Sequence, residues 1–362
     1  MNDFTVQSTN FRKHIRPLMG LFLFGFVSHA SALTVTVSIP PLAGIVAPLL
    51  GPEDELNILL KPGVSPHGFQ LKPSHVKLLQ DSDLVISVGT PVDGWIEKPL
   101  QRVHKTSIAM ANMENVEQLT LRQGGLWEKK HAHNNEPEHR ETDSDVHQHG
   151  STEHEHEAAE HVSTKHEVAE DESASHNHEK PVESMHLDGH LWMSLHNAKQ
   201  MVLAVSQRLQ IMLPEQKKVI EQRTVNWLVQ LDKTDQRIVK RLAKVKTEPF
   251  LVLHDAFQYF EHQYGLNGVG SIRLNPELAP SLKRVHELRE RIKSGHVTCL
   301  FKEPQFPEKR VMSVVTGLDV KLGSLDPMGT SYSLGKPFMA YDAFLEALAN
   351  QFSNCLMSDK GH

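Results

Sequence analysis

From Leu33 onward, short segments rich in apolar and β-branched residues alternate with longer segments whose apolar residues recur at helical spacing. This alternation is typical of βαβ units, in which parallel strands form a sheet that helices cover. We expect strands at residues 34–39, 56–60, 84–88, 105–109, 250–253, 268–272, 297–301 and 320–325. We expect helices at residues 73–80, 198–213, 256–264, 281–294, 307–316 and 341–355.

One helical pattern in the middle of the chain is longer than the others. It begins at Pro214 and continues to about Val245, with its apolar residues on one stripe. A helix of about 30 residues is roughly 45 Å long, enough to cross from one lobe to another. The sequence therefore predicts an α/β fold of two lobes, each a mostly parallel sheet flanked by helices, joined by one long helix. We assign residues 33–214 to the N-terminal lobe, 215–246 to the linking helix and 247–362 to the C-terminal lobe.

Residues 129–185 interrupt the first lobe with a tract that has almost no apolar residues. Eleven of the 24 histidines lie between residues 131 and 180, together with 14 Asp or Glu and three basic residues. Such a tract cannot bury a core, so we expect a solvated, disordered insertion. Its local charge of −11 leaves +5 for the rest of a chain whose net charge is −6, which gives no case for nucleic-acid binding.

The histidines of this insertion are interspersed with carboxylates. Neutral imidazoles and carboxylates at this density favour several weak, exchanging zinc sites over a plain acidic linker, because a linker needs charge but not histidine. We expect the insertion to capture or buffer zinc. The candidate ligands are His131, His133, His147, His149, His154, His156, His161, His166, His176 and His178.

Residues 1–32 have the pattern of a secretory signal peptide. Basic residues at positions 12, 13 and 16 precede an apolar run at 18–27, and Ala30-Ser31-Ala32 matches a cleavage site. The run is too short to be a membrane span, which needs roughly 20 apolar residues. We therefore expect a mature chain that begins near Leu33 and is located in a bacterial periplasm.

The chain has two cysteines, Cys299 and Cys355. An oxidising compartment favours one disulfide between them, and two buried free thiols are the alternative. In the chain-entropy model, a disulfide that closes a loop of this length stabilises a fold by roughly 4 kcal/mol.

Four polar side chains stand where α/β folds bind ligands, beyond the carboxyl ends of strands. His67, His254 and Asp326 each follow a predicted strand, and His190 opens the chain after the insertion. Two of the four come from each side of the long helix, which predicts a site in the cleft between the lobes. Three imidazoles and one carboxylate suit Zn²⁺ in tetrahedral geometry. No local ligand spacing links the four, so on this pattern alone hydrogen-bonded structural residues are an equal alternative.

The stretches around these residues resemble a known family. The longer ones are Pro62-Gly63-Val64-Ser65-Pro66-His67-Gly68-Phe69, His190-Leu191-Trp192-Met193-Ser194 and Leu253-His254-Asp255-Ala256-Phe257-Gln258-Tyr259-Phe260. The shorter ones are Asn275-Pro276-Glu277, Glu303-Pro304-Gln305-Phe306 and Leu325-Asp326-Pro327-Met328-Gly329. In order and spacing they are similar to the ZnuA family, the periplasmic zinc-binding components of zinc ABC importers within cluster A-I of the solute-binding proteins.

The resemblance covers essentially all of the mature chain. It implies a rigid linking helix and a cleft site in which His67, His190 and His254 bind Zn²⁺. It also implies a transport protein without enzymatic activity, a monomer whose partners are a membrane permease and its cytoplasmic ATPase. In manganese-carrying relatives the position of His254 is usually Glu, so nitrogen at this position fits Zn²⁺. The pair of cysteines also resembles the zinc branch of the family.

The sequence departs from the family pattern at two positions. Close zinc relatives often carry Glu just before the first histidine, where this chain has Pro66. The fourth ligand is therefore open: Asp326, water or none. Some relatives have a histidine that is linked to a second zinc site at the position of Ser271, so a second site of that kind would have to come from the insertion alone.

Two other functions are compatible with the same residues. Three histidines on Zn²⁺ are also a catalytic set, so a secreted zinc-dependent hydrolase is one alternative. The chain has no H-E-x-x-H motif, which counts against it. A metal-linked adhesin is the other alternative, since some relatives have that role.

Overall fold

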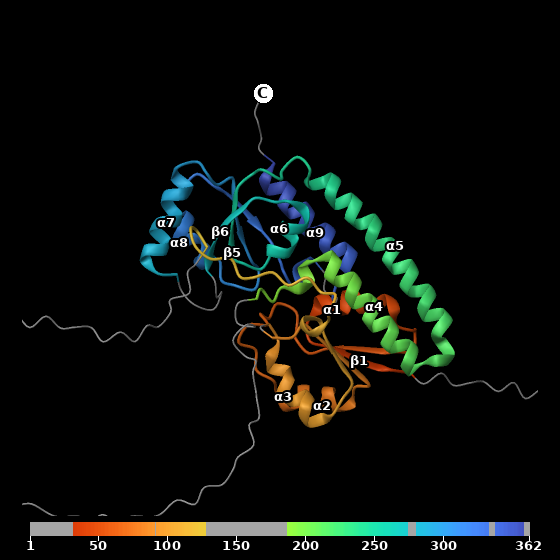
Figure 1. Ribbon diagram of the computed structural model, residues 1–362. Coiled ribbons are helices and arrows are strands. Elements are labelled where there is room, and N and C mark those ends of the chain that lie inside the picture. The colour runs from red at the N-terminus through yellow and green to blue at the C-terminus, as the bar shows by residue number, and fades with distance from the viewer. Residues whose placement is uncertain (1–31, 91, 128–186, 274–279, 333–336, 358–362) are drawn as a thin grey trace, which may run out of the picture. The chain divides into compact units, whose positions relative to one another are not determined.

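The computed structural model describes residues 32–90, 92–127, 187–273, 280–332 and 337–357. The predicted signal peptide, except for Ala32, and the histidine-rich insertion at 129–185 lie outside the described residues. From Leu33 onward the described chain forms two sheets, with helices on both faces of each (Figure 1).

The first sheet contains four parallel strands in the order β2-β1-β3-β4. Val85 of β3 packs with Leu79 and Ile96 on one face, beside α2 and α3. Its neighbours Leu84 and Ile86 belong to the larger core on the other face. This alternation explains why the strand is buried on both sides. The elements of this lobe are β1 (Thr34–Val37), α1 (Pro40–Val46), β2 (Glu55–Ile58), α2 (Pro73–Asp81), β3 (Leu84–Ser87), α3 (Glu97–Val103) and β4 (Ser107–Ala109).

The second sheet repeats the arrangement, with parallel strands in the order β6-β5-β7-β8. Leu251 of β5 packs with Leu288 of α7 and Val314 of α8, whereas Phe250 faces α9, where its ring lies 5.2 Å from that of Phe352. The elements are β5 (Phe250–His254), α6 (Gln258–Tyr264), β6 (Gly268–Arg273), α7 (Leu282–Lys293), β7 (Cys299–Lys302), α8 (Lys309–Val315), β8 (Lys321–Ser324) and α9 (Tyr341–Leu356).

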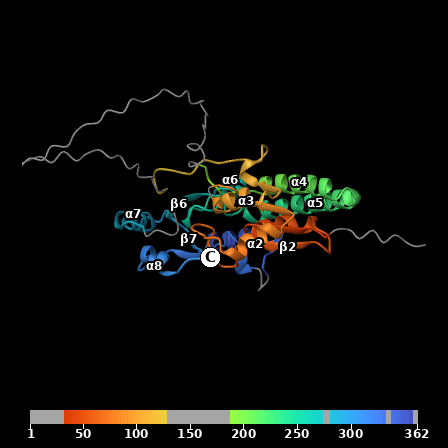
Figure 2. The same cartoon turned by 90° about the horizontal axis from the view of Figure 1, so that it is seen from below.

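Two long antiparallel helices, α4 (Leu195–Met212) and α5 (Lys217–Leu242), lie side by side (Figure 2), and α5 extends along both lobes. Ser194 caps α4 by accepting a hydrogen bond from the backbone N–H of Asn197, the interaction expected of a serine N-cap. On α5, Trp227 Nε1 donates to the carbonyl of Ile45 in the first lobe at 3.0 Å. Further along, Gln230 Nε2 donates to Asp342 of α9 at 3.0 Å. The linking helix is thus attached to both lobes.

The contact between α1 and α9 also joins the lobes. A Cβ atom on Gly44 of α1 would lie 2.4 Å from the carbonyl oxygen of Met339 and 3.0 Å from the amide nitrogen of Tyr341. Only glycine fits so close an approach of two backbones. One continuous hydrophobic core therefore extends from Val35 in β1 to Phe352 in α9.

The predicted strands and helices are all present, with small differences at their ends. Two further helices, α1 and α3, are both seven residues long and were not predicted from the sequence. The disulfide between Cys299 and Cys355 is confirmed: it joins β7 to α9, with the two Cα atoms 6.0 Å apart. Among the described residues, no helix combines the length and the apolar character that crossing a membrane requires.

Candidate metal centre

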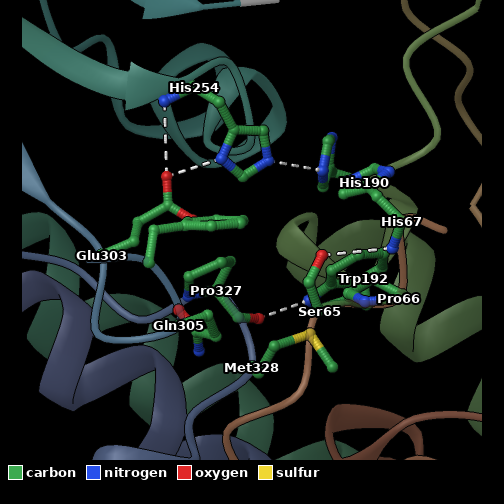
Figure 3. A pocket seen from close by; sticks show the side chains of 11 residues that line it. Ser65, Pro66, His67, His190, Trp192, His254, Glu303, Gln305, Pro327 and Met328 are labelled. Carbon is green, nitrogen blue, oxygen red and sulfur yellow. Dashed lines mark hydrogen bonds and ion pairs between the residues drawn. The ribbon is translucent and has the colours of Figure 1, made fainter. Parts of the chain in front are cut away.

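His67, His190 and His254 come together between the two lobes, and their candidate ligand nitrogens all lie within 4.8 Å of one another (Figure 3). Their ring centroids are 5.2 to 5.6 Å apart. His67 lies in the loop after β2, His190 just before the short 3₁₀ helix Leu191–Met193, and His254 at the end of β5. Residues from both lobes therefore meet as the sequence predicts.

His254 is oriented by a buried carboxylate. Glu303, which follows β7, accepts a hydrogen bond from His254 Nδ1 at 2.5 Å and one from its backbone N–H at 3.3 Å. Because Nδ1 is engaged, the other nitrogen, Nε2, faces the cluster and lies 3.3 Å from Nε2 of His190. Burial alone would lower the pKa of His254, but the charge and hydrogen bond of Glu303 outweigh it and raise this pKa.

His190 is held in the same way by Asp188, two residues before it. Asp188 Oδ1 lies 2.7 Å from His190 Nδ1 and also accepts the backbone N–H of His190 at 3.0 Å. The indole of Trp192 lies beside the imidazole, with 5.3 Å between ring centroids. Trp192 Nε1 donates to the carbonyl of Pro327 at 2.8 Å, which links this side of the site to the second lobe.

His67 is held by its loop. Gly63 and Gly68 on either side adopt φ angles of 79° and 74°, in the left-handed region that favours glycine. Trp95 Nε1 donates to the carbonyl of Pro66 at 3.2 Å, and Ser65 Oγ accepts the backbone N–H of His67 at 3.2 Å. Burial, with added repulsion from His190 and His254, lowers the pKa of His67 to about 2. Its imidazole is therefore neutral and ready to bind a cation.

A cavity of about 10 Å³ lies at the centre of these side chains, with Glu303 and Gln305 in its wall. This is close to the space that a single water molecule needs. Glu303 Oε2 and Gln305 Oε1 are buried there without a hydrogen-bond partner among the described residues. The site thus has room for one small ion.

Asp326 is not part of the three-histidine group. It is fully buried, and both carboxylate oxygens accept hydrogen bonds from its own loop: Met328 N at 2.9 Å, and Ser331 N and Oγ at 2.6 Å. Gln305 Nε2 is a further donor to Oδ1. This placement favours water or no fourth ligand over Asp326.

Ser271 is buried in β6, where its backbone N–H donates to the carbonyl of Leu126 at 3.2 Å and its own carbonyl accepts from Arg284 at 2.5 Å. The histidines of the insertion lie outside the described residues. Sequence reasoning missed the roles of Glu303 and Asp188. Asp188 lies two residues before a candidate ligand, and this local signal could have identified it, whereas Glu303 follows a strand whose pairing with β5 the sequence does not give.

Comparisons with known proteins identify the family of this chain. The family described as "ZnuA: Zinc-uptake complex component A periplasmic" matches residues 35–355. The high-affinity zinc uptake system protein ZnuA of Yersinia pestis is 31% identical over 331 residues, which are 90% of this chain and 92% of that protein. Its counterpart in Haemophilus ducreyi is 32% identical over 341 residues, with 94% and 98% covered.

Solved structures show the same fold. A crystal structure of ZnuA aligns with a TM-score of 0.65 at 18% identity and covers 90% of this chain and 100% of that one. The periplasmic zinc binding protein TroA from Treponema pallidum aligns with a TM-score of 0.64 at 17% identity, covering 91% and 100%. The chain therefore belongs to the ZnuA family, the periplasmic component A of zinc-uptake complexes.

Proposed function

We propose that the chain captures Zn²⁺ on His67, His190 and His254 and delivers it to the membrane permease of an ABC importer, which a cytoplasmic ATPase drives. The observation that carries this proposal is the convergence of three imidazoles from both lobes on one small cavity. Loss of any one of the three imidazoles would leave too few ligands for a tight site.

The choice of zinc rests on the donor set. Three imidazole nitrogens suit Zn²⁺, whereas Mn²⁺ and Mg²⁺ prefer oxygen ligands. Asp188 and Glu303 bind Nδ1 of His190 and His254, respectively. Both rings are therefore held in one orientation, with Nε2 directed to the metal site. With Asp326 engaged in its own loop, a water molecule completes the tetrahedron in this proposal.

We further propose that the N-terminal lobe ends at residue 214 and that the linking helix ends at residue 246. We also propose that the histidine-rich insertion holds zinc weakly and passes it to the cleft site, and that the chain acts as a monomer. The family is one of transport proteins, not of enzymes.

The test is metal analysis and zinc titration of the mature chain, residues 33–362, against a chelating dye. Wild type should hold one tightly bound Zn²⁺, and His67→Ala, His190→Ala and His254→Ala should each weaken that site by orders of magnitude. His262→Ala is the matched control, because its side chain is 61% exposed on α6 and lies outside the cluster. Near-normal titration of a cleft variant would remove that residue from the site.

Delivery is tested in cells. A strain that lacks this protein should fail to grow in chelator and recover with added zinc. The wild-type gene should restore growth, and the His254→Ala gene should not. Restoration by that variant would contradict the role of the cleft site in uptake.

A further inference from the structure

The residues on either side of the insertion are joined to each other. Thr120 forms an antiparallel bridge with Leu187, and Asp188 N donates to the carbonyl of Leu119 at 2.8 Å. Tyr259 of α6 binds both sides: its hydroxyl accepts the N–H of Leu119 at 2.9 Å and donates to the carbonyl of Asp188 at 2.7 Å. We call these four residues, Leu119, Thr120, Leu187 and Asp188, the stem junction.

Arg122 attaches the segment after Thr120 to the second lobe. Its Nε donates to Asp255 Oδ2 at 2.9 Å, and its Nη1 donates to Glu261 Oε2 at 2.5 Å. Its guanidinium also stacks on Trp127, 3.6 Å from the ring centroid. Both carboxylate side chains are 3% exposed and that of Arg122 is 20% exposed. The guanidinium of Arg122 is therefore the shared partner of two buried carboxylates.

Asp255 and the stem junction each lie next to a metal ligand. Asp255 directly follows His254 in the chain. Arg122 lies two residues after Thr120 of the stem junction, and Asp188 of that junction holds His190 Nδ1. Arg122 thus connects the segment that holds His190 with the residue next to His254, and these come from distant parts of the sequence.

Buried ion pairs are a poor source of stability, because apolar side chains of similar size often serve as well or better. A buried pair does fix geometry, since its charges and hydrogen bonds tolerate few arrangements. We infer that Arg122 is a positioning residue for the metal centre: it holds the stem junction against residues 255–261, and so fixes the relative placement of His190 and His254. This inference rests on the proposed function of the cleft.

The test measures zinc release from the full mature chain. Zn²⁺ dissociation is followed after mixing with excess chelator, and the visible spectrum of the Co²⁺ form reports ligand geometry. Arg122→Met should release zinc about tenfold faster, the lower end of the effect seen when the support of a ligand is removed. It should also alter the Co²⁺ spectrum. Arg122→Lys, which keeps a charge but not the planar fork, should give an intermediate rate.

Two further variants keep the test decisive. Lys199→Met removes an exposed ion pair with Asp232 and should release zinc as wild type does. Arg122→Met leaves two unpaired buried carboxylates, so the triple variant with Asp255→Asn and Glu261→Gln replaces the whole ionic group if the single variant fails to fold. Fast release and an altered spectrum in the triple variant would then support the inference.

A purely structural role has a different signature. It would lower the melting temperature of metal-free Arg122→Met and leave both the release rate and the Co²⁺ spectrum as in wild type, which would overturn the inference. A triple variant with wild-type release would overturn it equally. If wild type itself takes up no zinc, the proposed function fails instead, so the two failures are distinguishable.

Discussion

Replacing Glu303 by Gln keeps the shape of the side chain and removes its charge. In the native protein, Glu303 Oε1 accepts hydrogen bonds from both Nδ1 and the backbone N–H of His254, and the side chain is almost fully buried. A hydrogen bond to a charged group contributes roughly 1.5–3 kcal/mol, and about 1.4 kcal/mol corresponds to tenfold in affinity. Gln retains an acceptor, so we expect Glu303→Gln to bind zinc about tenfold more weakly. Leu retains no acceptor, so we expect Glu303→Leu to bind zinc about 100-fold more weakly.

The assay is a competitive titration of zinc against a fluorescent chelator. It is done at a pH high enough that the zinc affinity of the protein no longer rises with pH. That condition matters because loss of the Glu303 charge also makes His254 easier to deprotonate, which would mask part of the effect at lower pH. Glu308→Gln is the matched control, since Glu308 is 57% exposed and pairs with Lys302 outside the site. Wild-type affinity in both Glu303 variants would refute the argument that this carboxylate orients His254.

Asp326→Ala should weaken zinc binding, because it loosens the loop from Pro327 to Ser331. Paired titrations should show an unchanged preference for Zn²⁺ over Mn²⁺. A marked rise in that preference would instead identify Asp326 as a lost oxygen ligand. Lowering the pH from about 8 to about 5 should weaken zinc binding, because protons compete for His254, whose pKa is raised. In the metal-free protein the same raised pKa stabilises the fold below the ordinary value of 6.5, and this contribution is lost as the pH rises through the raised pKa. The rise in melting temperature on adding zinc should therefore be larger at about pH 8 than at about pH 5, and an equal rise at both would contradict the assignment. Deleting residues 131–179 should leave one tight site and remove the weaker ones, as counted by calorimetric titration; unchanged stoichiometry would show that the insertion does not hold zinc.

The strand pattern was enough to predict most of the fold and to place His67 and His254 after strands, whereas the assignment of all three histidines to one metal site depended on the resemblance to the ZnuA family. His254 ends a run of buried residues at the carboxyl edge of a parallel sheet, and ligands bind at such edges. The helix α1 escaped prediction because its apolar residues Pro40–Val46 are buried all round and show no amphipathic period.

Apart from Asp188, which lies two residues before His190, the residues that support the ligands could not be predicted from sequence alone. Asp326 stands at the right strand end, but its orientation depends on a loop that turns back and donates its own N–H groups. Glu303 and His254 are close only because β7 pairs with β5, and sequence order does not fix which strands are neighbours. Arg122 precedes both of its carboxylate partners by more than 100 positions, and no local spacing marks so distant an ion pair.

The close approach of Gly44 to Met339 and Tyr341 affects the order in which this protein can fold. It brings a helix near the start of the described chain against the beginning of the last helix, and α9 also fills the face of the second sheet around Phe250. Contacts between such distant segments form late, because a long loop must close before they contribute. Neither lobe can complete its core until the final helix has been synthesised. A chain cut short before α9 would leave the core that both lobes share without the side chains of this helix.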